Sequence, residues 1–276
     1  MALPAYSSRE DKLWHYGARL LCAMVLAYLL LPMLIIVPIS FTSGNLLSFP
    51  LPGFSLRWYE SLYAGTSWTD AARNSLLIGL SATALSVVLG TLGALGLARA
   101  RFKLKPVVIG LIVSPMVIPI VITAVGSYFF LVAIGLVGTY PGLILAHTVL
   151  AVPFVVITVL VTLEGFDLNL MRAASSLGAS PWTAFRRVML PIIFPGVASG
   201  ALFAFATSLD ELVVTLFVAG PDQRTLPRQI FSGVREYVSP AIAAVATILV
   251  VLSSLLLLTV ELLRRRAERM RARPGG

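Results

Sequence analysis

The chain has few of the residues on which most enzyme and metal sites depend. It contains one cysteine, Cys22, so an intramolecular disulfide is impossible. Its two histidines, His15 and His147, lie far apart and have no carboxylate partner at metal-binding spacing, so we expect no metal site. We expect His147 to be a neutral imidazole that is hydrogen-bonded to a neighbouring helix. Only 12% of the residues are charged, well below the roughly 25% of a typical soluble domain.

Two sequence motifs are also missing. No Gly-x-x-x-x-Gly-Lys-Ser/Thr phosphate loop is present, so any ATP that powers this protein must be bound by another subunit. No Gly-x-Ser-x-Gly elbow is present, which argues against a serine hydrolase. We therefore expect a protein that is not an enzyme and binds no cofactor of its own.

Long uncharged apolar runs fill most of the chain, which is 58% hydrophobic and has a mean hydropathy of +0.93. A membrane-spanning helix needs about 20 apolar residues. The glycine-rich stretch 135–142 divides the longest run, 106–163, into two spans. We predict an all-α membrane protein with a single domain, residues 1–276, and six spanning helices at about 18–40, 74–98, 107–133, 141–163, 192–219 and 240–263. The first run is too long for a signal peptide and lacks a clear cleavage site.

The positions of lysine and arginine predict the orientation in the membrane. Most of the 21 basic residues fall on one side of the predicted spans, which is typical of the cytoplasmic side. We therefore expect both termini and the 164–191 loop to be cytoplasmic, and the net charge of +9 to reflect topology, with no nucleic-acid partner. The cytoplasmic group comprises Arg9, Lys12, Arg19, Arg99, Arg101, Lys103, Lys105, Arg172, Arg186, Arg187, Arg264, Arg265, Arg266, Arg269, Arg271 and Arg273.

Two adjacent acids, Asp210 and Glu211, interrupt the fifth apolar run. Each costs about 2.5–3.5 kcal/mol at mid-membrane on insertion scales, so both should face protein or water. On a continuous helix, Glu211 extends a small-residue stripe that suits close helix packing and includes Gly196, Gly200, Ala204, Thr207, Ser208 and Thr215. Asp210 lies on the neighbouring stripe.

Aromatic residues flank Asp210 on its stripe. A carboxylate between aromatic rings suits an ammonium group, through ion pairing and cation–π attraction. The alternative is that each acid pairs with a basic side chain of a neighbouring helix. We predict a substrate pathway that contains Asp210, Glu211, Phe203, Thr207 and Phe217.

The 164–191 loop predicts a bent pair of short helices. Residues 168–177 favour helix, and Gly178 suits the left-handed conformation that ends one. Ser180 can then cap a second helix, with Pro181 at its first position. In this second helix Trp182 and Phe185 recur at helical spacing, which gives the loop an apolar knob. A shaped, partly apolar loop on a membrane protein predicts a docking partner.

The same loop resembles the coupling loop in permease subunits of bacterial ABC importers. That pattern is Glu-Ala-Ala, three residues, Gly, nine residues, then Ile-x-Leu-Pro; Ala173, Ala174, Gly178, Leu190 and Pro191 match it. Arg172 replaces the Glu and Val188 replaces the Ile. The resemblance implies the six-helix type I importer permease fold and an ATPase-coupling surface made of Arg172, Ala173, Ala174, Leu177, Gly178, Ala179, Ser180 and Pro181. Whether Arg172 contacts the ATPase stays open.

Further stretches resemble the spermidine/putrescine-type branch of these permeases. They are the run from Phe54 to Tyr59, Asn74 to Leu76, Ser208 to Val214, Gly220-Pro221, Thr225 to Pro227, Ile230 to Ser232 and Val238 to Pro240. The resemblance implies a bacterial inner-membrane protein that works with a second permease, two copies of an ATPase that bind ATP and magnesium, and a periplasmic binding protein. It implies import of a polyamine. We also expect a short helix from Ser55 to Leu62 in the first outer loop.

Other functions fit parts of the same pattern. Related permeases serve opine-like compounds, amino-alkyl acids, phosphonates or iron. A passive channel or a membrane scaffold is a different class of function; Pro115, Pro119 and Gly126 would fit the gates of a pore, but a channel has no need for a docking loop with this spacing. A secondary transporter would usually show two matching halves, and none is visible.

Overall fold

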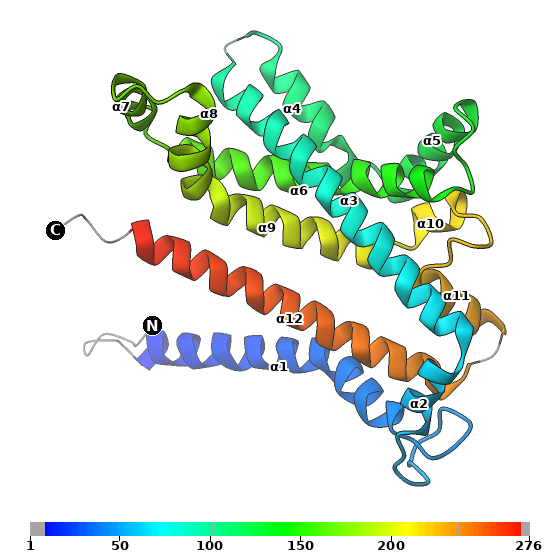
Figure 1. Cartoon of the computed structure of the whole chain (residues 1–276). Coiled ribbons are helices and arrows are strands. Elements are labelled where there is room, and N and C mark those ends of the chain that lie inside the picture. Colours follow the sequence, from blue (N-terminus) through cyan, green and yellow to red (C-terminus); the bar gives the residue numbers. More distant parts are fainter. Residues whose placement is uncertain (1–8, 101, 237, 272–276) are drawn as a thin grey trace. The chain divides into compact units, whose positions relative to one another are not determined.

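The computed structural model describes residues 9–100, 102–236 and 238–271, and most of these residues are helical. Arg101 and Arg273, which contribute to the predicted orientation, lie outside them. The helices form two compact units: residues 1–64 with 233–251, and residues 65–232 with 252–276. The helices of the first unit are α1 (Arg9–Ser40), α2 (Arg57–Ala64) and the first part of α12 (Pro240–Arg271) (Figure 1). The end of α11 (Leu226–Glu236) also belongs to this unit.

The loop between α1 and α2 is held by local contacts. Ser43 donates its backbone N–H to Gly53, and a β-bridge joins Thr42 to Phe54. The Arg57 guanidinium donates to Asn45 Oδ1 at 2.6 Å and lies 4.7 Å from the ring centre of Trp58. The short helix that we expected near 55–62 is α2, so that prediction is confirmed with a two-residue shift.

Besides the first part of α11 and the last part of α12, the second unit contains the other helices that the structure describes. They are α3 (Thr66–Arg99), α4 (Lys105–Val113), the 3₁₀ turn η1 (Ser114–Met116), α5 (Ile120–Ala133), α6 (Tyr140–Glu164), α7 (Asn169–Ser176), α8 (Pro181–Ala184), the π-helical turn η2 (Phe185–Met189), α9 (Leu190–Leu209) and α10 (Val213–Val218). α3, α6 and α9 pack against one another and form its core (Figure 1).

Small residues allow α9 to lie close to α6. A β-carbon added at Gly200 would lie 2.5 Å from Thr158 Oγ1 and 2.9 Å from Val155 Cα, and one added at Gly196 would collide with Thr162. Ala204 and Ser208, further along the same face, are buried. The predicted small-residue stripe is therefore confirmed as a helix-packing surface as far as Ser208.

Among the described residues, five helices are long and apolar enough to cross a membrane, and a sixth span is possible if a bent pair counts as one. The predicted helix 107–133 is wrong as a single helix: α4 with η1 and then α5 meet at an angle of 102°. Pro115 and Pro119 bracket this bend. Pro119 has an extended backbone at the start of α5, and each proline lacks the N–H that a continuous helix requires.

The predicted helix 192–219 is also wrong at both ends. Helical structure begins earlier, at Pro181, and α9 ends at Leu209. Residues 210–212 then separate α9 from α10; we call them the 210–212 break. Glu211 accepts the backbone N–H of Val214 at 2.7 Å, so its carboxylate caps α10 and favours a new helix start over continuation of α9.

Candidate functional site

The bend after α7 is a complete Schellman motif, which ends a helix by satisfying its last carbonyl groups. Gly178 has φ +82°, Gly178 donates its N–H to Ser175 O, and Ala179 donates to Ala174 O, both at 3.0 Å. No atom of the residues that the structure describes lies within 4 Å of the place where a β-carbon on Gly178 would be, so the backbone conformation alone requires glycine here. The predicted helix end at Gly178 is confirmed.

The second arm of the bend also follows its sequence signals. Ser180 Oγ accepts the N–H of Thr183 at 3.3 Å, and Pro181 begins α8. Because η2 is π-helical, α8 continues into α9 without a separate start. Buried Phe166 and Met189 belong to the core cluster at this end of the second unit, against which Met171 and Phe185 pack. We call residues 168–187 the elbow.

The tip of the elbow presents apolar side chains to solvent. Leu177 is 88% exposed and Trp182 is 68% exposed, and the Trp182 ring stacks on Phe185 at 5.6 Å. Arg172 donates to Asn169 Oδ1 of the same helix. The structure thus brings the eight predicted coupling residues together on one projecting element, which lies at one end of α6 and α9 (Figure 1).

The two acids at the 210–212 break differ sharply in environment. Glu211 is 6% exposed, and its carboxylate accepts the backbone N–H of Val214. Asp210 is exposed and occupies the C-cap of α9. Phe203 stacks on Phe154 of α6, and Phe217 belongs to α10. The predicted continuous stripe through Asp210 to Phe217 is therefore wrong, because the helix that would carry it ends at Leu209. Thr207 is half-buried on the last turn of α9.

His147 joins the two sides of the 210–212 break. It is 1% exposed on α6, its Nδ1 lies 2.7 Å from Ser208 Oγ of α9, and its Nε2 lies 3.1 Å from Thr215 Oγ1 of α10. The prediction that His147 is hydrogen-bonded to a neighbouring helix is confirmed, and it bonds to two. Among the described residues no cluster of His, Cys, Asp and Glu has the makings of a metal site.

A second polar cluster, which sequence reasoning missed, holds the 219–225 loop between α10 and α11. Asn74 donates to the backbone oxygens of Asp222 and Arg224, and the Tyr140 hydroxyl donates to Asn74 Oδ1 at 2.9 Å. Arg228 donates to the carbonyls of Ala219 and Gly220; burial lowers its pKa, and the charge of Arg224 lowers it further. The sequence signal for this cluster was Asn74, a polar residue near the start of a long apolar run.

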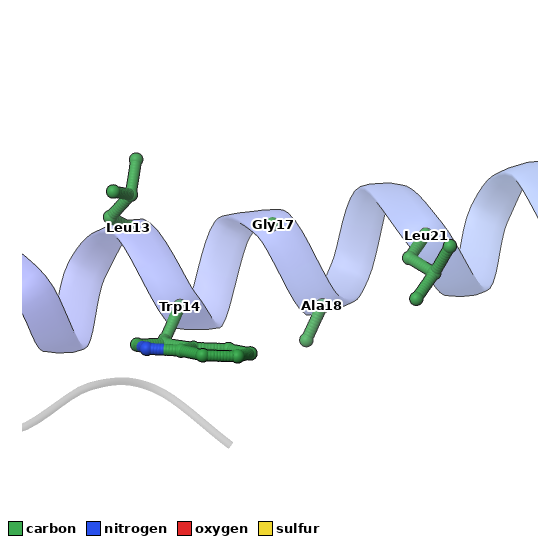
Figure 2. A pocket seen from close by; sticks show the side chains of 5 residues that line it. All are labelled: Leu13, Trp14, Gly17, Ala18 and Leu21. Carbon is green, nitrogen blue, oxygen red and sulfur yellow. The ribbon is translucent and has the colours of Figure 1, made fainter.

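Two surface hollows among the described residues lie away from the 210–212 break. One lies on α1 and is lined by Leu13, Trp14, Gly17, Ala18 and Leu21; Figure 2 shows that these side chains come from a single helix. The other, of about 340 Å³, lies beside the elbow between the ends of α3 and α6, and Arg99, Glu164 and Phe166 are among its lining residues. Neither hollow gathers groups that would perform chemistry.

Comparisons with known proteins agree on one family. Residues 16–269 match the model described as binding-protein-dependent transport system inner membrane component. The chain is 36% identical over 241 residues to the spermidine/putrescine transport system permease protein PotC of Escherichia coli K12, covering 87% of this chain and 91% of that one. It is 35% identical over 253 residues to the putrescine transport system permease protein PotI of the same organism, covering 89% and 90%.

A solved structure has the same fold. It is a bacterial ABC transporter involved in the import of alginate, which matches 94% of this chain and 99% of its own chain with a TM-score of 0.75 at 14% identity.

Proposed function

The chain belongs to the family of binding-protein-dependent transport system inner membrane components, and from this membership we propose that it is the permease subunit of an ATP-driven polyamine importer. The observation that carries the substrate class is the identity of 35–36% with permeases named for spermidine and putrescine, over nearly the full length of each. The protein spans the bacterial inner membrane several times. We propose that the bent pair of α4 and α5 counts as one span, which gives six, with both termini in the cytoplasm.

We infer the other subunits from the family to which the chain belongs. Because the chain has no phosphate-binding loop, we assign ATP and magnesium to a partner ATPase, which we propose is a homodimer. A second, homologous permease completes the pathway, and a periplasmic binding protein delivers the substrate to the outer loops. The elbow supplies the ATPase contact, because exposed Leu177 and Trp182 form an apolar knob beside the charged side chains of Arg186 and Arg187. Large aromatic anchors of this kind dominate binding at protein interfaces.

Asp210 is the group that we assign to the ammonium end of the substrate. It is exposed at the C-terminus of α9, where the helix dipole concentrates partial negative charge next to the carboxylate. Broken spanning helices use such ends to bind cations. Glu211 instead serves the structure, since its carboxylate caps α10.

Replacing Asp210 by asparagine tests this assignment. The change keeps the shape but removes the charge, so uptake of putrescine per assembled complex is expected to fall about tenfold, as for a lost charge-assisted hydrogen bond. Uptake of radiolabelled putrescine into proteoliposomes that contain the whole complex measures this, with complex quantified in the same vesicles. Asp222→Asn is the control, because Asp222 is also an exposed aspartate and is described only through its backbone oxygen. Unchanged uptake with reduced assembly would assign Asp210 a structural role.

A passive channel is the competing function class. Co-purification distinguishes the two classes. A permease should co-purify with an ATPase, whereas a channel should co-purify only with further copies of itself. The elbow favours the permease. Its exposed Leu177 and Trp182 lie on a bend that Ser180 caps, and a pore does not require such a docking surface.

A further inference from the structure

His147 is well placed to control the geometry of the 210–212 break. The ring is buried on α6, and its two nitrogens bond to hydroxyl groups that lie on opposite sides of the break, Ser208 and Thr215. Only three residues separate α9 from α10, and they include the exposed Asp210 and the buried Glu211. A side chain from a third helix therefore joins the two helix ends that flank both acids.

The hydrogen bonds around His147 form a directed chain. With the single proton of Thr215 Oγ1 donated to the backbone oxygen of Glu211 at 3.2 Å, Thr215 accepts from His147 Nε2–H in the matching neutral tautomer. Nδ1 of the neutral ring is then left as the acceptor for the Ser208 hydroxyl. The chain thus runs from Ser208 through His147 and Thr215 to the Glu211 carbonyl, and every described polar atom in it is satisfied.

We propose that His147 is a positioning residue for substrate transfer: it fixes the angle between α9 and α10 so that Asp210 stays at the exposed end of α9. The inference rests on the proposed role of Asp210. Glu211 supplies the second constraint, because its carboxylate caps α10 from within the break. Without His147, the cap on α10 remains, but the tie between Thr215 and Ser208 is lost.

Conservative variants separate the two hydrogen bonds. In His147→Asn the amide reaches approximately the position of Nδ1 and keeps the Ser208 bond, whereas in His147→Gln it reaches approximately that of Nε2 and keeps the Thr215 bond. His147→Leu loses both. Thr148→Val is the matched control: it removes a buried hydroxyl from the next position of α6, where the bond goes to Ile144 O of the same helix and not across the break.

Hydrogen exchange of the intact transporter complex tests the tie directly. In His147→Leu, backbone amides in peptides covering 206–219 are expected to exchange about tenfold faster, which is the effect of losing a buried hydrogen bond. His147→Asn and His147→Gln should lie between the leucine variant and the native protein, and Thr148→Val should match the native protein. Unchanged exchange at 206–219 in His147→Leu would overturn the proposal.

A double-mutant cycle tests the link to the substrate. His147→Asn is expected to reduce putrescine uptake per assembled complex about fivefold in the native chain and to have little further effect in Asp210→Asn, because it acts through that carboxylate. Equal reductions in both backgrounds would overturn the positioning role and leave the function of Asp210 intact. If Asp210→Asn alone leaves uptake unchanged, the proposed substrate contact fails instead, and the positioning role fails with it even where exchange at the break is faster.

Discussion

Replacing Gly178 by valine is expected to reduce ATP-driven uptake to background. Gly178 has φ +82°, a conformation in which a β-branched residue is strained by roughly 1–3 kcal/mol. The chain relieves that strain by leaving the Schellman turn, which moves α7 relative to α8 and displaces the exposed Leu177 and Trp182. Uptake, ATP hydrolysis and co-purification of the ATPase are measured on the same preparation. Either the ATPase is lost, or it hydrolyses ATP without transport.

Two substitutions control for the added side chain. Gly178→Asn supplies a residue that tolerates the left-handed conformation, so uptake should largely recover. Gly110→Val places the same valine at another glycine with open space around its β-carbon position, in α4, where φ is not positive, so coupling should persist. Normal uptake by Gly178→Val, with the ATPase still attached, would contradict the role of the elbow.

Replacing Gly200 by leucine is expected to prevent folding of the second unit. A β-carbon at this position already lies within 2.9 Å of the Val155 backbone, so a larger side chain forces α9 away from α6. The cost exceeds about 4 kcal/mol, which is comparable to the total stability of a marginally stable domain. The amount of monodisperse protein after detergent extraction measures the effect.

Gly96 provides the matched control for this packing prediction. It also lies in a long helix, α3, but none of the described atoms comes within 4 Å of the place where its β-carbon would be. Gly96→Leu should therefore yield protein close to the native amount. Equal yields for Gly200→Leu and the native chain would show that α6 and α9 do not pack as closely as described.

The elbow was predictable because its determinants are local. Three signals each specify the backbone over three or four residues: a glycine that takes positive φ, a serine cap, and a proline at the first helical position. The structure contains all three. The long helices α1, α3, α6 and α12 were predictable for a related reason, since hydropathy alone determines them.

The bends inside apolar runs were not predictable in the same way. Pro153 and Pro195 lie within α6 and α9 without ending them, whereas Pro115 and Pro119 bracket a bend of 102°. A proline therefore indicates only where a helix can bend, and packing decides whether it does. Hydropathy does not distinguish a proline inside a continuous helix from a proline at a bend.

The 210–212 break shows the same limit for charged residues. An acid within an apolar run was interpreted as a group that faces another helix or a substrate, because both readings assume a continuous helix. Glu211 instead caps α10, because its carboxylate accepts the backbone N–H of Val214. The sequence signal for this local interaction is an acid three residues before the residue whose N–H is bonded. His147 was found because a buried imidazole must have partners, although their identity required the fold.

The central claim is that this chain conducts polyamine only when a partner ATPase drives it. The most direct measurement is uptake of radiolabelled putrescine and spermidine by proteoliposomes that contain the complete complex and the loaded binding protein, with ATP, with a non-hydrolysable analogue, and in the Gly178→Val variant. We expect uptake only with ATP and the native elbow, and we expect unlabelled polyamine to compete with it. Equal uptake in all three conditions, or competition by an anionic solute and not by a polyamine, would contradict it.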